Sequence, residues 1–270
     1  ILSENKHLHF FSPKNKISSI KRKFKNLKIT FHEEEKIFEV LSSLKRKKFC
    51  IDGQTCSVFN EELIKSKFTI IDKIDPIYFL KSIKNKVEIK NMINSHIEDG
   101  VALTKFLYWI KNKKINNENE QAIEHKLEKF RKKNKNYLYP SFNTIAGSGP
   151  NGAIIHYRST KSSNRKLSYK DILLVDSGGQ YKWGTTDVTR TICFSKQPSK
   201  IKEIFTRVLK GHIAVASANI NKNTTGHDLD KKARKSLNSI DLDYRHGTGH
   251  GVGFFLNVHE GPQSISKNNK

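Results

Sequence analysis

The sequence predicts an α/β protein in two parts, because short runs of β-branched residues alternate with segments of helical periodicity along its 270 residues. The first part covers residues 1–80. There we expect strands at 49–51 and 68–71, since β-branched and aromatic side chains pack well on a pleated sheet. Residues 61–67, which lie between the two runs, are expected to form a helix. This alternation is typical of a piece of an α/β domain.

The pattern changes near residue 80, and the second part, residues 81–270, is expected to be a separate domain. Apolar residues recur at helical spacing from Ser82 to about residue 112, which predicts a long helix. The sequence Asn117-x-x-Glu120 resembles a capping box and is expected to open a second helix. The three glycines and the proline of segment 141–152 predict a loop.

Strands are expected next, at 153–157, 172–176 and 187–194, because these runs are rich in Ile, Val, Leu and Thr. Two helices should follow at about 199–219 and 226–238. Thr225-x-x-Asp228 matches a capping box at the start of the latter. The glycine-punctuated stretch 246–259 is expected to hold a further pair of strands. The second domain therefore combines helices with β-hairpins.

The composition sets limits on partners and compartment. The formal net charge is +24, which allows binding to nucleic acid, but the basic residues are spread over the whole chain and we do not expect nucleic acid as the partner. The cysteines, Cys50, Cys56 and Cys193, are odd in number and form no CxxC pair. A reducing cytoplasm fits this pattern better than a disulfide framework. The sequence has no apolar run long enough to span a membrane.

Two aspartates form the first candidate site. Asp176 ends the apolar run 172–175, where an ionised side chain must be paired or bind a metal. Asp187 follows eleven residues later, after a glycine-rich connection that can return the chain as a hairpin. Two adjacent carboxylates repel each other, and a divalent cation removes that cost. Taken alone, the pair could equally be turn or strand-end aspartates.

Histidines form the second candidate site. His246 and His250 lie in HGTGHGVG, whose glycines exclude the helical HExxH arrangement, and His259 follows nearby. Imidazole nitrogens bind metals and transfer protons, so these residues are candidates for both roles. A glycine-rich hairpin with surface histidines is the alternative. His156, in the expected strand 153–157, could also be a structural residue.

Three long motifs resemble aminopeptidase P, a family of the pita-bread (M24) metallopeptidases. The run from Asp176 to Thr191, DSGGQYKWGTTDVTRT, is similar to the first metal-binding hairpin of that family. The stretches HGTGHGVG and NVHEGP, which end at Pro262, resemble its histidine region. GPNGAIIHY at 149–157 resembles the segment with its substrate-binding histidine. The resemblance covers residues 82–262 and implies a pita-bread catalytic domain, with a curved antiparallel sheet covered by helices.

The resemblance also implies a ligand set. Family members hold two divalent ions, often manganese, with two Asp, one His and two Glu; zinc and cobalt are the alternatives. Asp176 resembles a ligand to one ion, Asp187 the carboxylate that bridges both, and His250 the single His ligand. His156, His246 and His259 resemble the outer histidines that orient the substrate, stabilise the tetrahedral intermediate and move protons. The implied nucleophile is a water that bridges the two ions.

The two Glu ligands lie beyond the segment that ends at Pro262 in this family, and this chain stops eight residues later. The resemblance therefore predicts a fragment without its C-terminal end, inactive by itself, whose residues 1–80 resemble the end of the preceding creatinase-like domain. The chain starts with Ile1, so we expect its N-terminus also to be a cut. For the intact protein the resemblance implies a homodimer that removes the first residue from peptides with proline second. A prolidase-type dipeptidase and a non-catalytic pita-bread protein that binds protein or nucleic acid are the alternatives.

Overall fold

The computed structural model describes residues 1–45, 47–112 and 115–268, and contacts divide the chain into two units, Ile1–Pro76 and Ile77–Lys270. The first unit contains two pairs of parallel strands, each joined through a helix. Its elements are β1 (Leu8–Phe11), α1 (Lys14–Ile20), β2 (Ile29–His32), α2 (Ile37–Ser43), β3 (Lys48–Ile51), α3 (Val58–Lys65) and β4 (Thr69–Asp72). Parallel pairs require such a crossover, because a tight turn can join only antiparallel strands.

The core of the first unit lies between its helices and strands. Leu41 of α2, Ile51 of β3, Ile64 of α3 and Phe68 are buried together. The hydroxyl of Ser57 accepts a hydrogen bond from the backbone N–H of Asn60 and so caps α3. The two strands and the helix that the sequence predicted within residues 49–71 are confirmed.

The second unit starts in α4 and alternates helices with short strands. These are α4 (Pro76–Ser82), α5 (Lys86–Asn112), α6 (Glu120–Arg131), β5 (Tyr137–Pro140), β6 (Ile145–Ser148), β7 (Ile172–Ser177), β8 (Gly179–Tyr181), β9 (Gly184–Thr185), β10 (Val188–Cys193), α7 (Ser199–Ala216), α8 (Gly226–Asn238), β11 (Gly249–Gly251) and β12 (Glu260–Ile265). Antiparallel pairing joins β6, β7 and β10 with β7 in the centre; further antiparallel ladders form in the order β5-β8-β9 and between β11 and β12.

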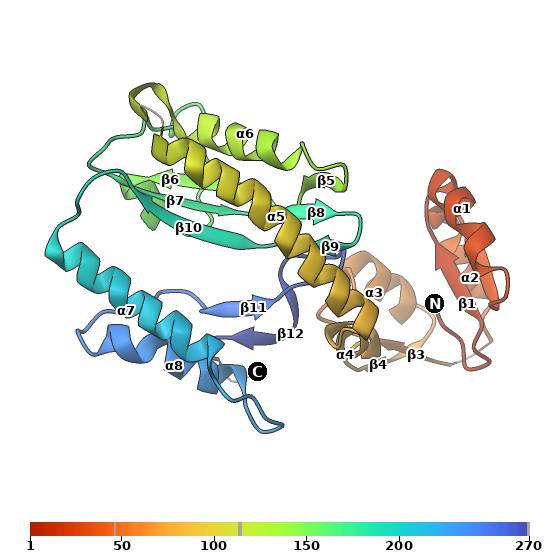
Figure 1. Ribbon diagram of the computed structural model, residues 1–270. Helices are drawn as coiled ribbons and strands as arrows, with labels where there is room; N and C mark the ends of the chain where they lie inside the picture. Colours follow the sequence, from red (N-terminus) through yellow and green to blue (C-terminus); the bar gives the residue numbers. More distant parts are fainter. Residues whose placement is uncertain (46, 113–114, 269–270) are drawn as a thin grey trace. The chain divides into compact units, whose positions relative to one another are not determined.

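Helices α5 and α6 lie together along the β6–β7–β10 sheet (Figure 1). The face of β7 that carries Leu173 and Val175 packs against Phe106 of α5 and Leu127 of α6, all of them nearly inaccessible to solvent. Burying each such side chain contributes roughly 1.5–3 kcal/mol. The opposite face of β7 carries Ile172, Leu174 and Asp176, which are only partly buried.

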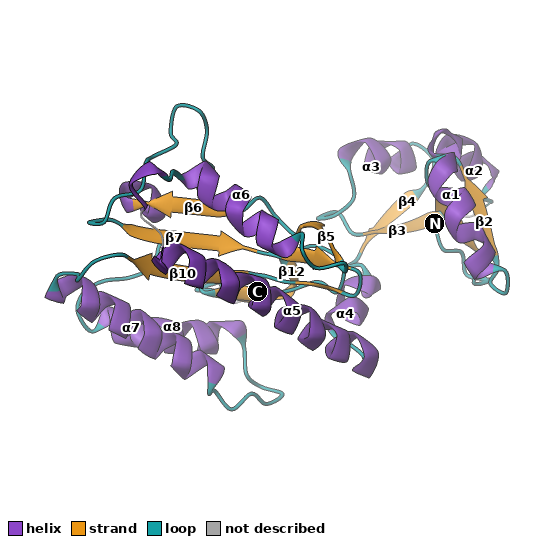
Figure 2. Ribbon diagram, turned by 45° about the horizontal axis from the view of Figure 1, so that its top comes forward, coloured by secondary structure: helices purple, strands orange, loops and turns teal. Residues whose placement is uncertain are grey.

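Helices α7 and α8 lie side by side (Figure 2). Their close approach depends on Gly211, because a Cβ atom there would lie 2.1 Å from the carbonyl oxygen of Ala233. At the start of α8, the capping box predicted for Thr225 and Asp228 is present in both directions. This pair of helices leads the chain into the segment that carries the later histidines.

Two predictions for the segment before β7 are wrong. The expected loop 141–152 contains β6, a fully buried strand whose small residues Ala146 and Gly147 conceal it from sequence patterns. The expected strand 153–157 is not a strand: a 3-10 helix, Gly149–Ala153, is followed by a turn. Its apolar residues Ile154 and Ile155 are 53% and 52% exposed, so an apolar run without a sheet neighbour did not form a strand here.

Two further boundaries also differ from prediction. The cap of α6 is Asn119 rather than Asn117, since the Asn119 side chain accepts the N–H of Ala122 at 2.9 Å. The predicted strand pair within 246–259 is displaced, because β11 pairs with β12, which begins after His259. Both differences depend on contacts outside the local pattern: Asn119 also bridges to Lys166, and β11 pairs with a strand that begins only at Glu260.

The charged surface agrees with the composition. Every residue from Lys21 to Lys28 in the first unit is exposed, and basic residues dominate this stretch. Across the described part of the chain, each helix is too short or too polar to cross a lipid bilayer.

Glu124 of α6 should make stability depend on pH. Burial, and then the charge of Glu120, raise the pKa of Glu124 to about 7. The folded state therefore keeps a proton that the unfolded state releases above its ordinary pKa of 4.5, and stability should fall as pH rises from 4.5 to 7. We expect Glu124→Gln to raise the melting temperature at pH 8, by about 2–4 °C per kcal/mol relieved. At pH 4 it should change little.

Calorimetry at both pH values tests this expectation, with Asp241→Asn at an exposed position of the second unit as the control. An equal change at pH 4 and pH 8 would contradict it.

Candidate functional site

Asp176 lies on the face of β7 that points away from the apolar core. Leu173, Val175 and Ser177 alternate with it and are buried. Asp176 is paired across the sheet with Thr189 of β10, whose hydroxyl donates a hydrogen bond to the carboxylate at 2.7 Å. The strand thus fixes the carboxylate while leaving it partly accessible.

Asp187 reaches the same face from the neighbouring strand. Val188 is paired with Ser177 and Thr189 with Asp176, so the period of two places Asp187 and Thr189 on the side that carries Asp176. The turn that allows this return is tight at Gly178, where a Cβ would meet the Thr186 carbonyl oxygen at 1.9 Å. The two aspartates therefore lie on the same face of the sheet, close enough for the charge of Asp187 to raise the pKa of Asp176.

His250, on β11, contacts Asp187 directly. Its Nε2 lies 3.1 Å from Asp187 Oδ2, and its Nδ1 lies 2.8 Å from the carbonyl oxygen of Gly251. The carbonyl can only accept, so Nδ1 carries a proton and Nε2 faces the carboxylate. The hydrogen bond to Asp187 is the main cause that raises the pKa of His250. A cation bound here would replace the proton on Nε2 and would be held by both Nε2 and the Asp187 carboxylate.

His259 joins this group just before β12. Ligand atoms of Asp187, His250 and His259 all lie within 4.8 Å of one another, and the rings of His250 and His259 are 4.0 Å apart between centroids. His156 comes from the turn after the 3-10 helix, with its ring centroid 5.9 Å from that of His259. Burial, followed by the charge of His250, lowers the pKa of His259. A neutral imidazole can bind a metal or accept a proton.

The electrostatics of the group fit divalent cations. Burial is the main cause that raises the pKa of Asp176; the Thr189 hydroxyl opposes the shift and the Asp187 charge adds to it. Two carboxylates that repel each other beside imidazole nitrogens form an oxygen-rich donor set with nitrogen, which suits manganese, zinc or cobalt. The residues present therefore fit the metal chemistry that the sequence motifs imply.

Asp176 and His156 lie beside this group rather than in it, and His246 makes its ring contacts elsewhere. Its Nδ1 lies 2.6 Å from the carbonyl oxygen of Gly247, and its ring packs against Tyr244 with centroids 5.4 Å apart. These are the contacts that the described residues give to its ring. The backbone of His246 is anchored, because its carbonyl accepts a hydrogen bond from Arg234 at 2.7 Å.

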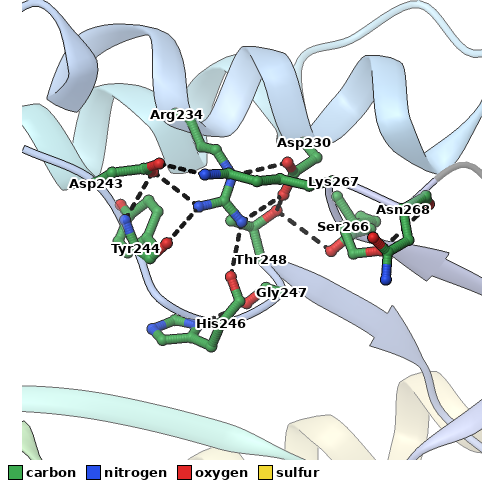
Figure 3. Close-up of polar contacts among 11 residues, drawn as sticks. Asp230, Arg234, Asp243, Tyr244, His246, Gly247, Thr248, Ser266, Lys267 and Asn268 are labelled. Carbon is green, nitrogen blue, oxygen red and sulfur yellow. Dashed lines mark hydrogen bonds and ion pairs between the residues drawn. The ribbon is translucent and has the colours of Figure 1, made fainter.

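Arg234 of α8 holds the loop that leads to β11 (Figure 3). Its guanidinium pairs with the buried carboxylate of Asp230 at 2.7 Å, and donates to Asp243 and to the carbonyls of Tyr244 and His246. The hydroxyl of Thr248 donates to Asp230 at 2.7 Å. The bidentate, nearly inaccessible pair is geometrically well defined and ties the glycine-rich histidine segment to a helix.

Further buried charges support the site, and the sequence analysis missed all of them. Arg131 donates to Asp99 and, at 3.0 Å, to the hydroxyl of Ser177, which follows Asp176. Glu260, which follows His259, has a fully buried side chain that pairs with Lys84. Nothing in the sequence distinguishes these residues from the other charged residues of a Lys-rich chain.

Two family models match the chain, and the boundary between them lies near the start of α5. Residues 90–270 match the model of metallopeptidase family M24, and residues 1–88 match the creatinase/prolidase N-terminal domain. Among curated relatives, aminopeptidase P2 of Arabidopsis thaliana is 50% identical over 193 residues, which are 71% of this chain and 27% of that protein. A probable Xaa-Pro aminopeptidase P of Laccaria bicolor is 44% identical over 240 residues, 86% of this chain and 37% of its own length. The chain thus spans about a third of these relatives.

Solved structures show the same architecture. An X-prolyl aminopeptidase from Caenorhabditis elegans, described as a cytosolic enzyme with a di-nuclear active site, superimposes with a TM-score of 0.83 at 31% identity and covers 96% of this chain and 44% of its own. A prolidase from Pyrococcus furiosus gives 0.77 at 27% identity over 96% of this chain and 74% of that one. The match over residues 90–270 shows that the chain belongs to metallopeptidase family M24 and has its pita-bread fold.

Proposed function

We propose that the whole protein is a metal-dependent aminopeptidase that removes the N-terminal residue from peptides with proline in the second position. The observation that carries this proposal is the cluster of Asp187, His250 and His259, with Asp176 facing Asp187. These residues occupy the positions of the aminopeptidase P motifs, and the two curated relatives described above carry that name. The proposal includes a cytoplasmic homodimer; the three free cysteines favour a reducing compartment.

Asp176, Asp187 and His250 would hold two divalent ions, of which manganese is our first choice, together with two Glu ligands that the family resemblance places after Pro262. Residues 263–270 contain no Glu. Bound there, the ions would polarise the scissile carbonyl and lower the pKa of a water molecule. Asp187 has the central place because its carboxylate faces Asp176 on one side and His250 on the other.

The outer histidines would handle the substrate and its protons. His259, whose pKa is lowered, is neutral at pH 7 and can accept a proton from a reacting group or donate a hydrogen bond to the developing oxyanion. His156 is exposed, and its ring packs near that of His259, where it can orient the carbonyl that is attacked. His246 would act through its loop rather than at the reacting atoms.

A pocket of about 520 Å³ adjoins His259 and can receive a peptide. It is lined by Tyr139, Ser141, Gln180, Phe255, Leu256, Asn257, Val258 and His259. Mixed apolar and amide groups suit a proline ring beside a peptide backbone, and a tertiary Xaa-Pro amide has no N–H to satisfy. A prolidase-type dipeptidase is the second candidate, favoured by the likeness to the Pyrococcus furiosus prolidase.

We expect the whole protein, loaded with manganese, to release the first residue from tripeptides and longer peptides of the form Xaa-Pro-Xaa. Amino-acid release is measured by chromatography, with Xaa-Ala-Xaa peptides as the control. Cleavage restricted to Xaa-Pro dipeptides would instead identify a prolidase. Failure to cleave any of these substrates in the metal-loaded protein would favour a non-catalytic relative.

Metal binding should depend on Asp187. This 270-residue chain holds three of the five proposed ligands, so we expect weak binding of one Mn²⁺ and no turnover. Asp187→Asn should abolish the calorimetric signal, because this carboxylate faces both other ligands. Asp241→Asn, an exposed position outside the cluster, is the matched control. Unchanged binding in Asp187→Asn would refute the ligand set.

His259→Ala should separate proton transfer from metal binding. In the whole protein we expect turnover to fall by about 10²–10⁴-fold, the usual contribution of a positioned acid or base, while two ions per chain remain. Metal content is measured by atomic emission, with His212→Ala on α7 as the control. Loss of an ion along with activity would instead identify His259 as a metal ligand. Its contact with His250 also allows that role.

A further inference from the structure

Glu120, the first residue of α6, has a side chain that is fully inaccessible to solvent. Both carboxylate oxygens accept hydrogen bonds, and every donor that the described residues provide is neutral. The Oε1 atom accepts the backbone N–H of Ser148 at 2.8 Å and the amide of Asn151 at 3.0 Å. The Oε2 atom accepts the Tyr157 hydroxyl at 2.7 Å and the backbone N–H of Arg165 at 3.0 Å.

These donors come from both ends and the middle of one segment, residues 148–165. The Glu120 N–H also donates to the Arg165 carbonyl at 3.1 Å, which closes the far end of the segment onto the start of α6. Tyr157 and Asn151 also contact the carbonyl of Ser163, so the residues that bind Glu120 are connected to one another within the segment. A single carboxylate thus gathers a segment that starts at the last residue of β6, forms no further strand and leads towards β7.

His156 is at the centre of this segment and directly precedes Tyr157. Its φ angle is 54°, a left-handed conformation that a residue with a Cβ adopts only at a cost in free energy. The apolar residues beside it, Ile154 and Ile155, are about half exposed and offer no core to hold the turn. The hydrogen bond from Tyr157 to Glu120 is therefore the nearest buried anchor to the strained residue.

We propose that Glu120 is the positioning residue for His156: its buried carboxylate fixes the 148–165 segment so that the His156 imidazole faces the metal ligands. The inference rests on the proposed function, in which His156 orients the substrate carbonyl. It explains why a carboxylate is buried at a helix N-terminus with only neutral donors around it, a place where the helix dipole favours negative charge. It also explains how a turn without apolar packing keeps one conformation.

The replacement Glu120→Gln tests the role with minimal change of shape. In either orientation of the amide, its NH₂ group meets a backbone N–H, that of Ser148 on one side or that of Arg165 on the other. One buried donor is then left without an acceptor, so the segment must shift. Tyr157→Phe removes one donor and keeps the carboxylate, and serves as a milder second variant if Glu120→Gln folds poorly. Glu203→Gln on α7 is the matched control.

The kinetic arm uses the whole, manganese-loaded protein and an Xaa-Pro-Xaa peptide. We expect Glu120→Gln to lower kcat/KM by about 10²-fold, the scale of a misplacement near 1 Å, with two ions still bound per chain. Because Glu120 acts through His156, Glu120→Gln should cost nothing further in a His156→Ala background. Equal losses in the presence and absence of His156, or loss of metal, would overturn the proposal.

The second arm needs no activity and uses hydrogen exchange of the 270-residue chain. Faster exchange confined to residues 148–165 in Glu120→Gln, and to a smaller extent in Tyr157→Phe, supports the proposal. Unchanged exchange, or faster exchange throughout the second unit, overturns it. If the wild-type whole protein cleaves no Xaa-Pro peptide, the proposed function fails while the exchange result still decides whether Glu120 holds the His156 segment.

Discussion

The antiparallel register between β7 and β10 is the constraint on which the candidate site depends. It pairs Asp176 with Thr189 and brings Asp187 to the same face of the sheet. A shift of one residue would turn Asp187 towards the apolar core, because side chains alternate along a strand. The buried side chains of Leu173 and Val175 prevent that shift, so the packing of α5 and α6 on one face determines the chemistry available on the other.

Buried charged groups hold three of the chain segments that carry candidate site residues. Arg234 holds the loop before His250. Glu260, which follows His259 in the chain, pairs with Lys84, and Arg131 donates to Ser177, which follows Asp176. Buried ion pairs contribute little net stability, and their directional hydrogen bonds fix the geometry of the segments that they join. In a chain with a net charge of +24, these few buried groups matter more for function than the many exposed lysines.

The sequence predicted the helices α5 to α8 and the strands β7 and β10, because their apolar periodicity is strong and the cap of α8 at Thr225 has a defined pattern. It also drew attention to the aspartates and to His250, since carboxylates after an apolar run and histidines between glycines are unusual. It missed β6, whose small residues carry no periodic signal, and mistook the exposed turn at His156 for a strand. The buried partners could not be predicted, because burial of a single charged residue depends on contacts between distant segments.

We propose that Asp187 would stand between two cation sites, one shared with Asp176 and one with His250. Anomalous diffraction at the manganese edge, from crystals of the whole protein grown with Mn²⁺, tests it most directly. We expect two peaks, both in contact with the Asp187 carboxylate, one also bound by Asp176 and the other by His250 Nε2. A single peak away from Asp187, or peaks that leave His250 paired with Asp187 as a salt bridge, would contradict it.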